Sequence, residues 1–171
     1  MKELLDISRE YITAVRLKSA NAMENGVRQI ELAAYLTHCN LQPAHLALTL
    51  NLAMSQAYKG GNFITAAAFA RRILELPDGK AEFHKMAKRV LQKSEQNARN
   101  ESKLNYDERN PFEIDCGNLS PIYRGNQLTR CSFCQSAYTC DMKGRLCTTC
   151  NIALIGIETL GLVTQAQARG A

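Results

Sequence analysis

The sequence predicts an α+β protein in which a helical N-terminal domain is followed by a small β-rich module. Apolar residues recur at helical spacing up to about residue 98. From Phe112 onward the pattern changes to the alternation that is typical of strands. The last third also holds two C-x-x-C pairs. We therefore expect a helical domain at 1–98, a linker at 99–111, a β-rich module at 112–165 and a tail at 166–171.

Five apolar stripes predict five helices, and local signals mark some of their ends. Pro43 stands where a third helix would begin, a position that favours proline. Gly60-Gly61 would end that helix, and Asn62 would cap the next one. Pro77-Asp78-Gly79 reads as a turn. The stripes are Leu4, Ser8, Tyr11, Ile12 and Val15; Val27, Ile30, Ala33 and Ala34; Leu46, Leu50, Ala53, Met54 and Ala57; Phe63, Ala66, Ala67, Ala70, Ile73 and Leu74; and Phe83, Ala87, Val90 and Leu91.

An alanine run, Ala66-Ala67-Ala68, indicates close packing of two helix backbones. A helix pair with a tight glycine turn and an alanine-rich second helix resembles tetratricopeptide-like hairpins. At most two such units are present, without a strict period. The helical domain is thus either a solenoid fragment that docks a partner or an ordinary helical bundle.

The segment from 92 to 110 is polar, with Leu104 and Tyr106 as its only large apolar residues. We expect these two side chains to pin the linker to one domain. Beyond it, Phe112, Ile114 and Cys116 alternate with polar residues as in a half-buried strand. A second short strand is expected at 121–126, running into a turn, and a buried strand at 152–157.

The chain contains seven cysteines, four of which predict a metal site. Cys131 and Cys134 are separated by two residues, as are Cys147 and Cys150, and twelve residues lie between the pairs. Two tight turns of this kind complete a tetrahedral set of sulfur ligands, and the gap suits one short hairpin. This layout predicts a zinc-ribbon-like module that holds one zinc ion.

The predicted zinc is structural, because four thiolates leave no open position for an activated water. A β module of about 60 residues also needs a bound metal to stabilise its fold, since its own hydrophobic core is small. Cys140 is a weaker candidate ligand, and it and Cys116 are more simply read as small buried residues. The paired spacing in a chain without a signal peptide favours a reducing compartment, cytosol or nucleus.

Two other classes of function compete with a scaffold that holds structural zinc. His38, Cys39 and His45 are close in sequence, but no third orienting residue accompanies them, so we expect no catalytic residues and no enzyme. A zinc-ribbon nucleic-acid-binding or transcription-type module is the alternative. The net charge of +5 is mild, and aromatic side chains that could stack on bases are few near the cysteines, which disfavours nucleic acid.

No apolar run approaches the roughly 20 residues that span a membrane. The first six residues carry charges where a signal peptide would be apolar. Composition therefore predicts a soluble chain without a transmembrane segment or a targeting signal of its own.

Several runs, in the same order, resemble the C-terminal domain of the coatomer alpha subunit. They are AAYLTHCNLQP at 33–43, NFITAAAFARRILEL at 62–76, LNYD at 104–107, NPFEI at 110–114, PIYRG at 121–125 and KGRLC at 143–147. The likeness extends from about Arg9 to Gly161, which is far more specific than one cysteine pair.

The resemblance implies a non-catalytic role in the COPI vesicle coat. That family's C-terminal domain binds the coatomer epsilon subunit, and the coat returns cargo from the Golgi to the endoplasmic reticulum. The chain would then act in the cytoplasm, peripheral to the cytosolic side of Golgi membranes and coated vesicles. The resemblance also implies that the chain corresponds to the last part of that domain.

Overall fold

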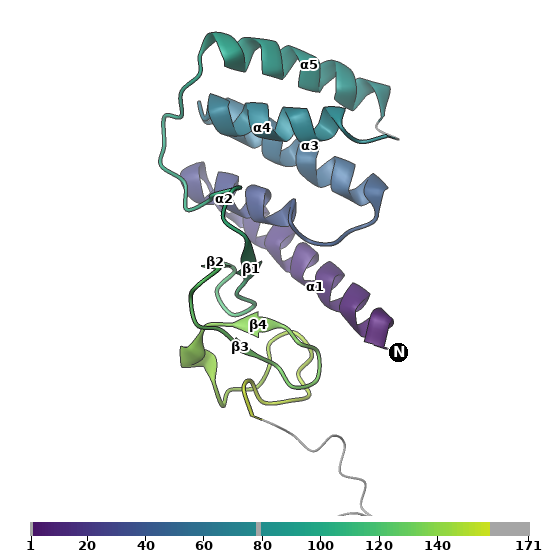
Figure 1. The fold of residues 1–171 in the computed structure, drawn as a ribbon, viewed down its shortest axis with the longest axis vertical. Coiled ribbons are helices and arrows are strands. Elements are labelled where there is room, and N and C mark those ends of the chain that lie inside the picture. The colour runs from purple at the N-terminus through teal and green to yellow at the C-terminus, as the bar shows by residue number, and fades with distance from the viewer. Residues whose placement is uncertain (1, 78–79, 158–171) are drawn as a thin grey trace, which may run out of the picture. The chain divides into compact units, whose positions relative to one another are not determined.

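The computed structural model describes residues 2–77 and 80–157 of the 171, which form five helices followed by short strands (Figure 1). The predicted α+β class is confirmed. The described residues form two compact units, one of Glu10–Arg109 and the other of residues 2–9 and 110–157. Asp78 and Gly79 of the expected turn, and all of the expected tail, lie outside the described residues.

Each apolar stripe of the sequence lies in a helix. The helices are α1 (Lys2–Met23), α2 (Gly26–Leu36), α3 (Pro43–Lys59), α4 (Phe63–Leu74) and α5 (Ala81–Gln96). Pro43 is the first residue of α3, as expected, since proline has no N–H to leave unpaired there. Gly60 caps the C-terminal end, and Gly61 follows at φ +73°, a conformation that favours glycine.

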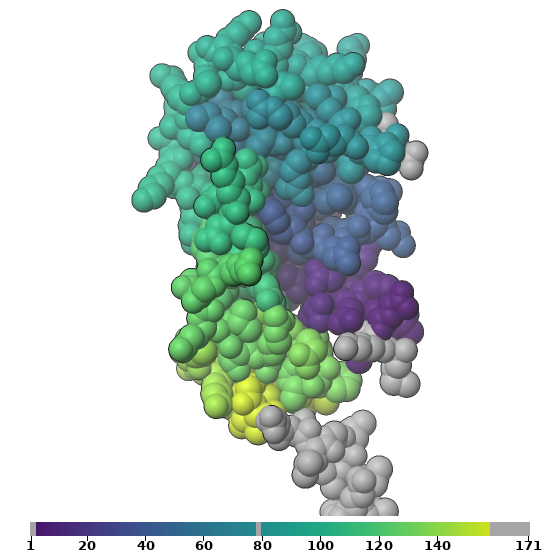
Figure 2. All heavy atoms as spheres, in the orientation of Figure 1, coloured from purple at the N-terminus to yellow at the C-terminus, as the bar shows by residue number. Residues whose placement is uncertain are grey.

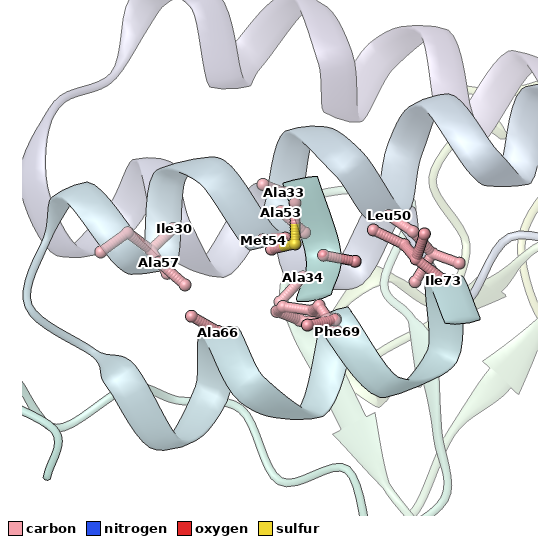
Figure 3. Close-up of a cluster of buried hydrophobic side chains, with 12 residues drawn as sticks. Ile30, Ala33, Ala34, Leu50, Ala53, Met54, Ala57, Ala66, Phe69 and Ile73 are labelled. Atoms are coloured by element: carbon pink, nitrogen blue, oxygen red, sulfur yellow. The ribbon is translucent and has the colours of Figure 1, made fainter. Parts of the chain in front are cut away.

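Small side chains dominate the core of the helical unit (Figure 3). Ala33, Ala53 and Ala66 are fully buried or nearly so, and they let consecutive helices pack closely. Phe69 fills the space among them, although the sequence stripe on α4 did not include it. Helices α2 to α5 each contact the next along the chain, and α5 also contacts α3.

The apolar stripe predicted for α1 was wrong about which face is buried. Ile12 is 40% exposed and Val15 is 61% exposed. The buried face of α1 within the helical unit carries Thr13, Ala14, Leu17 and Asn21. The physical reason is a polar contact, because the amides of Asn21 and Gln56 hydrogen-bond reciprocally at 2.9 and 3.0 Å. A hydrophobic periodicity cannot reveal a pair of amides that hydrogen-bond on the packed face of a helix.

The segment after α5, residues 99–109, is an extended strap that runs along the helical unit (Figures 1 and 2). Leu104 and Tyr106 pack against the helical core, as the sequence indicated. The Tyr106 ring stacks on Phe69, and its hydroxyl hydrogen-bonds with Nε2 of His38 at 2.9 Å. The strap is therefore part of the helical unit.

The strap also caps α4, which corrects the role expected for Asn62. Asn62 stands at the N-cap position, but its side chain accepts a hydrogen bond from the Ser102 N–H at 2.9 Å. The side-chain oxygen of Asn100 accepts the N–H groups of Ile64 and Thr65 instead, at 3.1 and 3.3 Å. The free N–H groups at the start of the helix are thus satisfied by a residue more than 30 positions later.

The second unit holds two small antiparallel sheets. Strands β1 (Phe112–Ile114) and β2 (Pro121–Tyr123) pair with Glu113 opposite Ile122. Strands β3 (Thr129–Arg130) and β4 (Ala137–Tyr138) form the second sheet, and a 3-10 turn, η1 (Cys140–Met142), follows. A strand thus occurs at each of the two positions expected for 112–116 and 121–126.

The buried strand expected at 152–157 was only partly correct. Two isolated bridges occur there, Leu154 with Leu146 and Ile155 with Cys131. Ala153 and Ile155 are buried, whereas Ile152 is 59% exposed. The segment therefore has one buried face, and its continuous apolar run did not signal burial on both sides.

Candidate metal centre

The first cysteine pair lies in the turn that joins β3 to β4. The Cys131 N–H donates to the carbonyl of Ser136, and the Gln135 N–H donates to the carbonyl of Cys131, both at 3.0 Å. Gln135 takes a positive φ of 61°, which folds the turn back toward the first cysteine. The spacing of the cysteines suggested a hairpin between the two pairs, but the hairpin encloses the first pair instead.

The second pair repeats this geometry. The Cys147 N–H donates to the carbonyl of Ala153 at 2.9 Å, and the Asn151 N–H donates to the carbonyl of Cys147 at 3.0 Å. Asn151 has φ of 54°, at the same offset from its cysteine as Gln135. Two matching turns thus present the four sulfurs toward one another.

The sulfur atoms of Cys131, Cys134, Cys147 and Cys150 all lie within 4.8 Å of one another. Cys131 and Cys150 are separated by 3.7 Å between sulfurs, and Cys134 and Cys147 by 3.6 Å. Four sulfurs at about 2.3 Å from a zinc ion would form a tetrahedron with edges of about 3.8 Å. The donor set and its dimensions therefore fit such an ion.

Hydrogen bonds and burial act in opposite directions on the thiols. Burial raises the pKa of Cys131 and of Cys134. Burial also acts to raise the pKa of Cys147, but hydrogen bonds from the Tyr138 hydroxyl and two backbone N–H groups outweigh it and lower the pKa to about 6. Binding of a metal must displace the remaining thiol protons, so metal affinity depends on pH.

The two other cysteines of the unit lie outside this set of four. Cys116 is buried and packs in the same cluster of side chains, but it is not one of the four converging thiols. Cys140 is exposed in η1, so the expectation that it is buried was wrong. Cys140 is the first residue of this 3-10 turn, and its side chain lies at the surface of the unit.

Two buried polar residues beside the cysteines were not expected from the sequence. The alternation of β1 placed Asp115 on the outward side, yet it is 1% exposed and accepts the N–H and the hydroxyl of Thr139 at 2.9 and 2.7 Å. Tyr138 is fully buried, with its hydroxyl 3.1 Å from the sulfur of Cys147. The contacts of Asp115 with Thr139 and of Tyr138 with Cys147 join residues 24 and 9 positions apart, which no local pattern marks, although Asp115 also accepts the nearby N–H groups of Gly117 and Asn118 at 2.6 and 3.3 Å.

The three residues considered as a possible nucleophile cluster, His38, Cys39 and His45, make contacts within the helical unit. Nδ1 of His45 hydrogen-bonds with the Tyr11 hydroxyl at 2.7 Å, and His38 contacts Tyr106. Cys39 is buried at the end of α2. These contacts tie the three residues to the packing of the helical unit.

Fold and site together define an α+β protein of two units, in which a helical unit is joined to a small β unit with four converging thiols. A family model that describes the C-terminus of the coatomer (COPI) alpha subunit matches residues 1–169. The chain belongs to this family of coat proteins, which agrees with the expectation of a non-catalytic protein.

Curated relatives carry the same description. The chain is 44% identical over 165 residues to "Coatomer subunit alpha-1" of Arabidopsis thaliana, which covers 95% of this chain and 14% of the relative. It is 41% identical over 172 residues to "Coatomer subunit alpha" of Dictyostelium discoideum, with 95% and 14% covered. The Saccharomyces cerevisiae coatomer subunit alpha is 30% identical over 165 residues, with 94% and 14% covered. The chain thus spans about one seventh of the length of these relatives.

Within the described residues, no helix is both long and apolar enough to cross a membrane.

Proposed function

We propose that this chain serves in coatomer assembly through protein–protein contact, with the coatomer epsilon subunit as its partner. The observation that carries the proposal is the match to coatomer alpha subunits over nearly the whole chain. In this role the chain acts in the cytoplasm, on the cytosolic side of Golgi membranes and vesicles that return cargo to the endoplasmic reticulum. It contributes contacts and no chemistry.

Within this role, the four cysteines hold one structural zinc ion that keeps the β-rich module in shape. The tetrahedral dimensions of the sulfur cluster support this assignment. The closed ligand set leaves zinc no position for a substrate. We extend the proposal to the domain organisation, in which the helical domain and the zinc module are separately stabilised parts.

A binding assay with purified epsilon subunit tests the partner. The immobilised chain is expected to retain the epsilon subunit as a one-to-one complex that persists at moderate salt. The same immobilised chain is offered DNA and RNA over a salt series. Retention of nucleic acid that weakens steeply with salt, together with no retention of the epsilon subunit, would overturn the proposal in favour of a nucleic-acid-binding module.

Elemental analysis tests the zinc separately. Protein purified under reducing conditions is expected to contain one zinc per chain. Absence of any bound metal would refute the zinc site without deciding the partner.

A further inference from the structure

Two hydroxyl groups outside the cysteine set lie beside one sulfur of each pair. Oγ of Ser136 is 3.1 Å from the sulfur of Cys134, and the Tyr138 hydroxyl is 3.1 Å from the sulfur of Cys147. Ser136 and Tyr138 are two residues apart on one extended segment that includes β4, so their side chains point to the same side. Both are at most 1% exposed.

The hydrogen-bond partners of Tyr138 show where its proton goes. Its oxygen accepts the N–H of Thr148 at 3.1 Å. The Thr148 hydroxyl is also 3.1 Å away, but it donates its own proton to the carbonyl of Cys116 at 2.9 Å. The Thr149 hydroxyl, at 3.3 Å, can either donate a hydrogen bond to Tyr138 or accept one from it.

The tyrosine proton therefore has three possible acceptors, the hydroxyls of Thr148 and Thr149 and the sulfur of Cys147. A hydrogen bond to an ionised acceptor is about twice as strong as one between neutral groups. Once Cys147 is a thiolate, the sulfur is the preferred acceptor. Once Cys134 is a thiolate it can only accept, so the Ser136 hydroxyl is then the donor of that contact.

We propose that Tyr138 and Ser136 are positioning residues of the metal centre, which donate hydrogen bonds to the thiolates of Cys147 and Cys134 and thereby strengthen metal binding. This inference rests on the proposed zinc site. Four thiolates around one divalent ion leave a charge of −2 in a largely buried place, where uncompensated charge is costly. One donor to each pair offsets part of that charge and fixes the two sulfurs that are 3.6 Å apart.

The test compares the variants Tyr138→Phe and Ser136→Ala with the matched control Tyr123→Phe, which removes a tyrosine hydroxyl from β2 of the same unit. Zinc affinity is measured by competition with a chelator of known affinity. Loss of such a supporting hydrogen bond is expected to weaken zinc binding by about 10- to 100-fold in Tyr138→Phe. The control is expected to stay within about twofold of the unmodified chain by the same measure.

Replacement of zinc by cobalt(II) separates a hydrogen bond from simple packing. Removal of a donor raises the energy of the sulfur electrons, so the sulfur-to-cobalt charge-transfer band should move to lower energy in Tyr138→Phe and in Ser136→Ala. A weaker affinity with an unmoved band would overturn the inference, because packing alone would then explain it. Unchanged affinity and an unmoved band would overturn it as well.

Two further outcomes can be distinguished from a failure of this inference. If the unmodified chain binds no metal, the zinc proposal fails before the variants are compared. If Tyr138→Phe does not fold, the cobalt band of Ser136→Ala decides, since this substitution removes a single hydroxyl and leaves the aromatic ring of Tyr138 in place.

Discussion

Replacement of Cys147 by serine should expose and loosen the second unit and leave the helical one folded. Cys147 is fully buried, and its sulfur contacts both the sulfur of Cys134 and the Tyr138 hydroxyl. A structural zinc site contributes about 10–16 kcal/mol, so one of four ligands accounts for about 2.5–4 kcal/mol. The buried cluster around the thiols offers little else, because Tyr138 and Ile155 are the only large side chains among its described buried residues apart from the cysteines.

Hydrogen exchange of the zinc-loaded protein measures this effect. A loss of about 2.5–4 kcal/mol corresponds to a loss of protection of about two to three powers of ten. The loss is expected throughout 112–157, including the Cys147 N–H that donates to Ala153. The amides of α2 to α5 should keep their protection, since Phe69 and its neighbours form a separate core.

Cys140→Ser is the matched control, because it makes the same chemical change at an exposed cysteine outside the cluster. It should leave exchange unchanged in both units. Equal loss of protection in both units of Cys147→Ser would refute the reasoning, and so would an unaltered second unit.

Two further substitutions, at Gly156 and Tyr106, and one pH titration, of His38, test how the two units are packed. Gly156→Ala should destabilise the second unit by about 1–3 kcal/mol in thermal melts, because Gly156 has φ +66° and a Cβ there would clash with the Thr129 hydroxyl. Gly144→Ala is the control and should cost less, because Gly144 has φ +82° but open space around the added Cβ. Tyr106→Ala should lower the unfolding free energy of the helical unit by about 2–4 kcal/mol in urea, somewhat below the cost of a fully buried aromatic. His38 lies at the surface, yet partial burial of its ring and a nearby arginine lower its pKa to about 4. The helical unit should therefore lose stability as the pH falls from about 6.5 to about 4, by about 1 kcal/mol because water screens a surface group; a His38 ring signal in NMR that titrates near 6.5 in the folded state would contradict this.

The features that could be predicted are those that a short stretch of chain encodes. Helical periodicity, the proline at the start of α3 and the glycine at its end depend on neighbours within one or two turns. The cysteine set is equally local, since each pair needs only a tight turn. Even the strap's contact could be read from Leu104 and Tyr106, two large apolar residues in a polar segment.

The features that were missed depend on residues far apart in sequence. Asn100 caps α4 although Asn62 stands at the usual position, because the strap passes that helix end. The buried face of α1 follows from the contact of Asn21 with Gln56, 35 residues later. Tyr138 could have been noticed as a tyrosine between the cysteine pairs, but only the fold shows which sulfur it reaches.

Removal of the metal can show which unit makes the proposed contact with the epsilon subunit. The helical unit has its own apolar core and does not need the thiols to stay folded. Exposed apolar side chains do not choose between the units, since Val15 and Met23 are exposed at 61% and 85% in the helical unit and Ile152 at 59% in the other. On the proposal that the contact lies on the helical unit, chelation of the metal opens the second unit in hydrogen exchange but leaves epsilon binding within a few-fold. If chelation abolishes binding while α2 to α5 stay protected, the contact belongs to the metal-stabilised unit, and the zinc has a direct part in coat assembly.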